Sequence, residues 1–396
     1  MKKRIFILCL LFISFQNYVL GEEIPSYLKG YEDIYNKNPR QAALQWFKNA
    51  KSGLFVCFSP ASQLAGGTQE WLQLDNWHKV QKQFEMMDRY SRKSHLRDKL
   101  TTVFSGVESL VRSFNPVNFN ADSIADLAVS AGMKYVTFTT QHVVGKMFMF
   151  DTSISPWNSQ KLLKRDFVKE LSIACEKRGL GLFLYVTPPN DYIQEEVRTI
   201  LKELLTCYGN IAGIWFDGIG ECYRRPNDFM ESSRLYSYIR QLQPQCLISF
   251  KTGYTGDEDF LAPEWTQVKF DANNYALFNI NVPTEHGTSL YEETSPRNVL
   301  RITDNGFEYR KQCFNQVWKE ELSRKPIELC NPMLQNQEWF DVKEGIHKTV
   351  NEIWTEYEYT CLHDANYLLS IGLRGDGSVH PSDSKVLKEF GLLRNK

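Results

Sequence analysis

The sequence has 396 residues, of which 42% are hydrophobic and 13% are aromatic. A chain of this size and composition can bury a large core, so we expect one large domain with embellishments or two domains. Its 46 basic residues nearly balance its 47 acidic residues, for a formal net charge of -1, and no basic stretch is interleaved with aromatic residues. This balance argues against a nucleic-acid partner.

The first 21 residues are typical of an export signal. A basic stretch at residues 2–4 precedes an apolar run from Ile5 to Phe15, and Gly21 offers a small residue for cleavage. That run is too short to cross a bilayer comfortably, and no later window supplies about 20 uninterrupted apolar residues. We therefore expect a cleaved signal peptide at 1–21, export of the mature chain to a periplasm or the extracellular space, and no membrane span.

The spacing of cysteines and histidines indicates no metal site. Apart from Cys9, the cysteines are scattered without a CxxC pair, and the seven histidines form no HxH or HExxH motif. Several cysteines lie in apolar, strand-like segments, where a buried thiol is usual. We expect neither a catalytic metal nor a cofactor.

Short apolar runs alternate along the chain with amphipathic segments, which is the pattern of a parallel βα fold. The expected strands are 54–58, 135–139, 182–186, 211–216, 246–250 and 367–371. The expected helices are 122–130, 166–178, 195–207, 232–243, 347–361 and 382–392.

These elements predict an α/β fold, a (β/α)8-like (TIM-type) barrel that tolerates irregular elements. We expect a single domain over residues 22–396, without a full C-terminal β-sandwich. The stretch 273–310 is polar and has few periodic apolar positions, so we expect a long surface excursion near the mouth of the barrel.

One predicted strand, 211–216, ends abruptly in Asp217 and Gly218. Its six apolar residues suit a strand buried on both faces, as in a parallel sheet under helices. Catalytic groups of (β/α) barrels lie at the carboxyl ends of such strands, which makes Asp217 a candidate catalytic carboxylate. The alternative is that the Asp-Gly pair only opens a turn into the next helix.

Motifs spread along the chain occur in the order found in one enzyme family. They are residues 46–55 (WFKNAKSGLF), 70–71 (EW), 114–116 (FNP), 131–136 (AGMKYV), 215–218 (WFDG), 242–244 (LQP), 263–264 (PE) and 366–372 (NYLLSIG). Their order resembles that of the family 29 glycoside hydrolases, the α-L-fucosidases, over residues 45–393. Within it, segment 46–55 is similar to the opening strand of the family and 328–333 to a tryptophan-bearing pocket loop.

The resemblance implies a retaining exo-glycosidase that removes terminal α-L-fucosyl residues from an oligosaccharide or glycoconjugate by double displacement. Asp217 falls on the nucleophile of the family. Glu264 is the candidate acid/base, because 260–264 resembles the segment that carries this residue in some members. Glu258 is a nearby alternative, and Glu264 could also be a solvated loop residue. A retaining mechanism requires two carboxyl groups about 5–5.5 Å apart.

The resemblance also implies a set of sugar-binding side chains. An aromatic ring beside a carboxylate suits stacking on the apolar side of a sugar, and a neutral histidine can both donate and accept hydrogen bonds. Each candidate has a plainer alternative as a core or packing residue. The candidates are Glu70, Trp71, His142, Tyr185, Trp215, Lys251 and Trp339.

The sequence departs from the family in three parts of this pocket. Cys57 stands in the segment that normally reads His-Trp-Gly, Val143 and Val144 replace part of a histidine motif, and Lys251 stands where the family has arginine. Valine cannot hydrogen-bond to a sugar hydroxyl, so sugar recognition must differ. Two hypotheses follow: an active glycosidase, with fucose or a related sugar as its substrate, or a degenerate barrel that binds a glycan without cleaving it. Retention of the Asp217 carboxylate favours the enzyme, while the sequence indicates no oligomeric state.

Overall fold

The computed structural model describes residues 24–65, 109–142, 147–187, 194–217, 232–251, 257–270, 276–284, 287–292 and 325–395. The expected signal peptide and four candidate pocket residues, Glu70, Trp71, Val143 and Val144, lie outside these ranges. Among the helices that are described, none is both long enough and apolar enough to cross a membrane.

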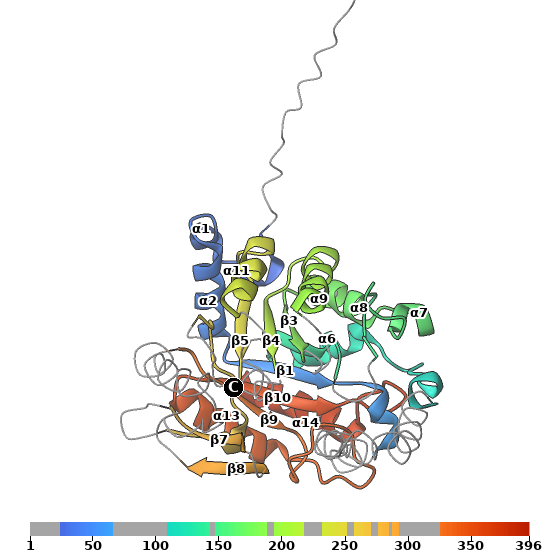
Figure 1. Ribbon diagram of the computed structural model, residues 1–396. Coiled ribbons are helices and arrows are strands. Elements are labelled where there is room, and N and C mark those ends of the chain that lie inside the picture. The colour runs from blue at the N-terminus through green and yellow to red at the C-terminus, as the bar shows by residue number, and fades with distance from the viewer. Residues whose placement is uncertain are drawn as a thin grey trace, which may run out of the picture.

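Seven parallel strands form a curled central sheet in the order β5-β4-β3-β2-β1-β10-β9 (Figure 1). Their inward and outward positions are both buried, as expected of a sheet covered by helices. The strands are β1 (Ser52–Cys57), β2 (Tyr135–Thr139), β3 (Gly181–Val186), β4 (Gly213–Phe216), β5 (Leu247–Phe250), β9 (Glu328–Pro332) and β10 (Asn366–Gly372).

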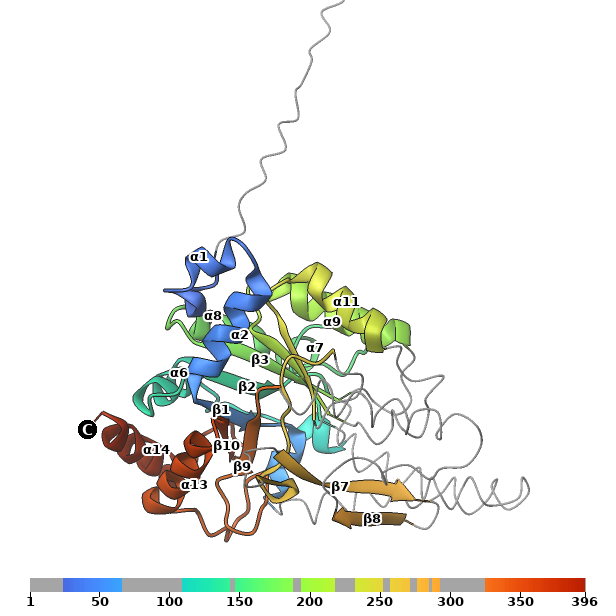
Figure 2. The same ribbon diagram turned by 90° about the vertical axis from the view of Figure 1, so that its left-hand side faces the viewer.

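Helices follow most of these strands and pack on the outside of the sheet (Figures 1 and 2). Polar N-caps define several of their starts, including Asn120, Asp166 and the capping box of Thr349 with Glu352. The α-helices are α1 (Glu32–Tyr35), α2 (Pro39–Ala50), α6 (Ala121–Ser130), α7 (Ser159–Leu163), α8 (Phe167–Glu176), α9 (Gln194–Cys207), α11 (Ser232–Leu242), α13 (Val350–Leu362) and α14 (Pro381–Arg394). The 3₁₀ helices are η1 (Ser26–Leu28), η2 (Pro60–Leu64) and η4 (Trp265–Gln267).

An irregular segment, 259–264, closes the gap between the edge strands β5 and β9. It forms isolated parallel bridges from Phe260 to Ser249, from Leu261 to Ile327 and from Glu264 to Cys330. Pro263 has no N–H group to donate, so a regular ladder cannot form here. With this segment as an eighth, irregular strand, the predicted (β/α)8-like barrel is confirmed.

Alternate side chains of each strand enter one of two cores. In β1, Leu54 and Val56 join the core between the sheet and its outer helices, whereas Phe55 and Cys57 point into the barrel. Helix α2 contributes to the inner core through Phe47, whose ring centroid lies 4.4 Å from that of Phe260 and 5.7 Å from that of Phe183. The inner core is therefore rich in aromatic rings, and it extends up to the residues at the carboxyl end of the barrel.

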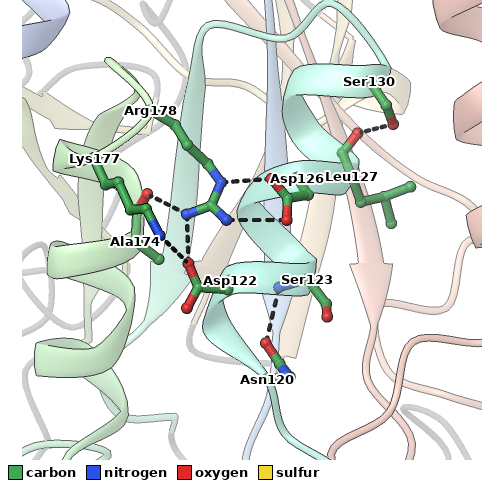
Figure 3. A network of polar contacts seen from close by, with 9 residues as sticks. All are labelled: Asn120, Asp122, Ser123, Asp126, Leu127, Ser130, Ala174, Lys177 and Arg178. Carbon is green, nitrogen blue, oxygen red and sulfur yellow. Dashed lines mark hydrogen bonds and ion pairs between the residues drawn. The ribbon is translucent and has the colours of Figure 1, made fainter.

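Polar contacts link the outer helices α6 and α8 (Figure 3). Arg178, just beyond α8, contacts Asp126 Oδ1 through Nε at 2.7 Å and Asp122 Oδ1 through Nη1 at 2.6 Å. Both aspartates are largely exposed, so such pairs contribute little to stability. We infer that the apolar faces of the two helices supply most of their docking energy.

Three segments differ from the sequence-based expectations. Residues 46–50 complete α2 and are not part of the opening strand, because Lys51 takes a left-handed conformation (φ 60°) and β1 begins only at Ser52. Residues 328–332 form strand β9 and not a loop. The stretch 273–310, expected as a long surface excursion in which no strand was predicted, contains the hairpin strands β7 (Ala276–Thr284) and β8 (Gly287–Glu292), which extend a sheet begun by β6 (Val268–Phe270) (Figure 2).

Truncating Phe47 tests whether α2 is part of the barrel core. Phe47 has no exposed surface, so we expect Phe47→Ala to lower the free energy of unfolding by about 3–5 kcal/mol. Chemical denaturation monitored by circular dichroism measures the loss. The exposed neighbour Lys48 provides the control, since Lys48→Ala should change stability by less than about 0.5 kcal/mol. Equal losses in the two variants would show that α2 is not docked as described.

Candidate active site

Polar residues from neighbouring strands meet at the carboxyl end of the barrel. Asp217 directly follows β4, and its backbone N–H donates to the carbonyl of Val186 at the end of β3 (3.1 Å). Lys251 directly follows β5, and Glu264 ends the irregular eighth strand. The carboxyl ends of parallel strands carry the active sites of (β/α) barrels, so this edge is the candidate site.

Among the described residues, Tyr185 and Lys251 hold the Asp217 carboxylate. Tyr185 Oη donates a hydrogen bond to Oδ2 at 2.7 Å, and Lys251 Nζ lies 3.6 Å from Oδ1. Burial and the negative charge of Asp217 raise the pKa of Tyr185, so its hydroxyl stays protonated and donates. The Asp217 side chain keeps 29% of its surface exposed, which leaves the carboxylate open to an incoming ligand.

Lys251 connects Asp217 with Glu264. Its Nζ donates to Glu264 Oε1 at 2.9 Å, and the same ammonium group lies 4.9 Å from the centroid of the Trp215 ring. Burial acts to lower the pKa of Lys251, but the charges of Asp217 and Glu264 outweigh it and raise the pKa. Lys251 is therefore a permanent cation between two carboxylates.

The two acid/base candidates lie in different surroundings in the structure. Glu264 has a side chain that is 30% exposed and lies within the carboxylate–lysine cluster. Glu258 is fully buried and accepts a hydrogen bond from Tyr236 of α11 (2.8 Å), a residue of the outer core between sheet and helices. This placement favours Glu264.

A buried layer of aromatic residues supports the two carboxylates. The Trp215 ring stacks on Tyr185 with centroids 5.4 Å apart, and its Nε1 donates to Glu328 Oε1 at 2.9 Å. Tyr135 Oη donates to the other carboxylate oxygen of Glu328 at 2.6 Å. Burial raises the pKa of Glu328 to about 7, although both hydrogen bonds oppose the shift. Trp215 is only 1% exposed, so the structure places it in the floor of the site.

His142 lies beside Tyr185, and two residues of a later loop contact His142 and Phe55. The His142 ring stacks on Tyr185 (5.7 Å between centroids) and meets the edge of Phe340 (5.1 Å). Burial lowers the pKa of His142 to about 3, so the imidazole is neutral and can both donate and accept hydrogen bonds. The adjoining Trp339 is partly exposed, and its ring centroid lies 6.3 Å from that of Phe55.

The Cys57 thiol lies on the wall formed by β1. It is buried, contacts Ser370 Oγ at 3.3 Å, and burial raises its pKa to about 12. The expected buried thiols are present, because Cys57, Cys175, Cys246 and Cys330 are all free and buried. The wall therefore presents an uncharged thiol.

A comparison with protein families decides the kinship. The model of the family described as alpha-L-fucosidase matches residues 25–394. The chain belongs to this family. The predicted kinship with the glycoside hydrolases of family 29 is thereby confirmed.

Curated relatives in this family are longer than the present chain. The tissue alpha-L-fucosidase of Bos taurus is 34% identical over 365 residues, which cover 87% of this chain and 66% of the bovine protein. Alpha-L-fucosidase 1 of Arabidopsis thaliana is 25% identical over 304 residues, covering 71% of this chain and 53% of the plant protein. The chain thus spans about half to two thirds of the length of these two relatives.

Solved structures of family members share the fold. An alpha-L-fucosidase from Lactobacillus casei in complex with its alpha-L-fucose product superposes with a TM-score of 0.58 at 20% identity, covering 89% of this chain and 98% of the other. Alpha-L-fucosidase isoenzyme 1 from Paenibacillus thiaminolyticus gives a TM-score of 0.59 at 20% identity, covering 90% and 76%. These likenesses support the irregular barrel assigned above.

One cluster of possible metal ligands occurs in the part of the family fold that the structure describes. Potential donor atoms of His347, His380 and Asp383 all lie within 4.8 Å of one another. His347 Nδ1 contacts Asp383 Oδ1 at 2.5 Å, and the two imidazole rings are stacked 4.0 Å apart at 17°. In-plane lone pairs of stacked rings cannot converge on one ion, so this geometry is that of an imidazole–carboxylate pair. The sequence-based expectation of no metal stays a prediction.

Two residues of the site were missed by the sequence analysis. Phe340 directly follows the candidate Trp339 and could have been found by extending that motif by one residue. Glu328 opens the segment that was interpreted as a pocket loop, and a glutamate at the start of an apolar run was the available signal. Neither signal reveals that Phe340 contacts His142 or that Glu328 accepts two buried hydrogen bonds.

The His347–Asp383 pair predicts a pH-dependent stability. The hydrogen bond to Asp383 raises the pKa of His347, while burial lowers the pKa of the stacked His380 and raises that of nearby Asp341. A raised folded-state pKa contributes stability that is fully present below about pH 6.5, the unfolded value, and is lost as pH rises through the folded value. We expect His347→Gln to destabilise the protein more at pH 6 than at pH 9 in denaturant unfolding.

His363 provides the control for this measurement, because burial lowers its pKa. The loss caused by His363→Gln should not grow as the pH falls from 9 to 6. A destabilisation by His347→Gln that is equal at both pH values would contradict the predicted linkage.

Proposed function

We propose that this protein is a retaining exo-glycosidase that hydrolyses terminal α-L-fucosyl residues of oligosaccharides or glycoconjugates. Asp217 is the nucleophile and Glu264 is the general acid/base. The observation that carries the proposal is the lysine shared by these two carboxylates at the carboxyl end of the barrel, in a chain of the alpha-L-fucosidase family.

The geometry of the shared lysine supports a retaining mechanism. Asp217 Oδ1 and Glu264 Oε1 lie 3.6 Å and 2.9 Å from Lys251 Nζ. The distance between the two oxygens therefore cannot exceed the sum of these two distances. Retaining enzymes place their carboxyl groups about 5–5.5 Å apart and inverting enzymes about 6.5–9.5 Å. The upper limit on the distance between the Asp217 and Glu264 oxygens is therefore compatible with the spacing of retaining enzymes and excludes nearly the whole range of inverting enzymes.

The charge of Lys251 suits both steps of a double displacement. When Asp217 attacks the anomeric carbon, its negative charge is lost in the new ester bond, and Glu264 becomes negative as it protonates the leaving oxygen. In the second step Glu264 accepts a proton from water as the water oxygen bonds to the anomeric carbon, the ester bond breaks, and the charge returns to Asp217. A cation in contact with both carboxylates stabilises the negative charge at either place without moving far.

His142 and Trp339 are the described residues best suited to contact the sugar itself. The neutral imidazole can bond a sugar hydroxyl, and the partly exposed indole offers an apolar face. Tyr185 and Trp215 are almost fully buried, so we assign them to holding the carboxylates. Glu70 and Trp71 retain their predicted pocket roles as part of this proposal.

The roles of the two carboxylates are tested by hydrolysis of 4-nitrophenyl α-L-fucoside with azide as an external nucleophile. Asp217→Ala should lower kcat by several orders of magnitude, and azide should restore turnover with formation of an inverted fucosyl azide. Glu264→Ala should lower kcat by about 10²–10⁴ and, with azide, give an azide of retained configuration.

Glu258→Gln is the matched control, since this carboxylate lies under α11, and it should retain nearly full activity. An α-L-galactoside and other 4-nitrophenyl glycosides assayed in parallel show whether specificity has moved to another sugar. A wild type that cleaves none of them, but binds fucosylated oligosaccharide in calorimetry, would replace the proposal with the non-hydrolytic glycan-binding barrel.

Removing the central cation should impair catalysis more than substrate binding. Lys251→Met keeps the length of the side chain but removes its charge, and we expect kcat to fall about 10²–10³-fold, the range seen when one electrostatic stabiliser is removed. KM should change much less, because the ammonium contacts the two carboxylates in the free enzyme. Steady-state kinetics separate the two, and a rise in KM at constant kcat would instead assign Lys251 to sugar binding.

A further inference from the structure

A buried carboxylate lies in the barrel interior and has no role in the proposed chemistry. Glu328 begins β9, has no exposed surface, and accepts hydrogen bonds from Tyr135 Oη (2.6 Å) and Trp215 Nε1 (2.9 Å). Burial of a carboxylate is unfavourable unless hydrogen bonds compensate it. An apolar side chain would fill the same space without this cost, so packing alone does not explain a glutamate here.

The Trp215 ring connects Glu328 to the candidate active site. One edge of the indole is fixed by the hydrogen bond from its N–H to Glu328. The ring stacks on Tyr185, and Lys251 Nζ lies 4.9 Å from the ring centroid. Tyr185 in turn donates to Asp217, and Lys251 contacts both Asp217 and Glu264. A rotation of the indole would therefore displace both groups that hold the carboxylates.

We propose that Glu328 is a positioning residue for glycoside hydrolysis, which fixes the Trp215 indole so that Tyr185 and Lys251 hold Asp217 and Glu264 in the reacting geometry. The inference rests on the proposed function and names a further residue of that same site. An acceptor is required at this position because the indole N–H can only donate. Tyr135, by contrast, can donate or accept, so it adapts to whatever group faces it.

Two substitutions at Glu328 separate positioning from bulk. Glu328→Leu leaves the indole N–H without an acceptor, and we expect kcat on 4-nitrophenyl α-L-fucoside to fall about 100-fold with KM nearly unchanged, as for a small misplacement of reacting groups. Glu328→Gln still accepts the indole N–H through its amide oxygen and can donate to the Tyr135 hydroxyl. It should therefore retain kcat within about 5-fold, which is rescue by the conservative variant.

Glu356 offers a matched control outside the barrel. It lies on α13, accepts a hydrogen bond from Tyr367 Oη at 2.5 Å and forms an ion pair with Lys348 Nζ at 2.9 Å. Glu356→Leu should lower the stability and leave kcat unchanged. If Glu328→Leu behaves in the same way, folded and with wild-type kcat, Glu328 is a structural residue and the proposal is wrong.

A spectroscopic measurement follows the hydrogen bond without using activity. The indole ¹H–¹⁵N resonance of Trp215 is assigned by its absence in Trp215→Phe. At pH 9, above the pKa of about 7 that burial gives Glu328, the indole proton should move upfield in Glu328→Gln, because a charged acceptor forms the stronger bond. An unshifted resonance would overturn the proposal. The double variant Glu328→Leu, Trp215→Phe should lose no more kcat than Trp215→Phe alone, and additive losses would also overturn the proposal.

These results distinguish the two levels of inference, and the indole resonance of Glu328→Gln tests the proposal even if Glu328→Leu does not fold. A wild type inactive on every glycoside overturns the proposed function and, with it, a positioning role in that reaction. An active wild type whose Glu328→Gln variant shows the indole shift, together with non-additive losses, supports both.

Discussion

The candidate active site depends on the backbone contacts between β5 and the irregular segment 259–264. The Asp259 N–H donates to the Ile248 carbonyl at 2.7 Å and the Ala262 N–H to the Lys251 carbonyl at 2.8 Å, which sets the register between the two. Because Lys251 directly follows β5 and Glu264 ends the irregular segment, this register brings the ammonium group and the carboxylate together. A slip by one residue would turn Glu264 to the opposite face of the segment.

Residues of the inner core support the candidate active site from within the barrel. Inward positions of β2, β4 and β9 provide Tyr135, Trp215 and Glu328, and their hydrogen bonds lie beneath the carboxylates where water is excluded. Electrostatic interactions are stronger in such an environment than at the surface. The carboxyl end is therefore supported by a buried layer in which both oxygens of Glu328 are hydrogen-bonded, and the outer helices act on this layer through the strands that they cover.

The sequence predicts regular elements well and irregular ones poorly. Strand β3 and helices α6 and α9 occur within one residue of the expected bounds, since their apolar periodicity is clear and their ends carry caps or glycine. Strand β9 was missed because its inward positions include Glu328 and its sequence reads as polar. The eighth strand was missed because Pro263 and isolated bridges leave no periodic pattern. Asp217 could be predicted because it ends an apolar run. Its partners Tyr185 and Lys251 are separated from it by at least 32 positions in the sequence, and no local pattern encodes such pairings.

We expect the departure from the family at β1 to affect sugar recognition and not bond cleavage. Cys57 points into the barrel, and its thiol is protonated and in contact with Ser370 Oγ, so the side chain at position 57 offers a sugar hydroxyl only a weak donor or acceptor. The opposite side keeps Lys251 next to both Asp217 and Glu264. A site without catalytic activity would not need to keep Lys251 buried between two carboxylates. Each of these charges is costly to desolvate when its partners are absent. We therefore expect the changed wall to select among sugars, while the paired carboxylates perform the hydrolysis common to the family.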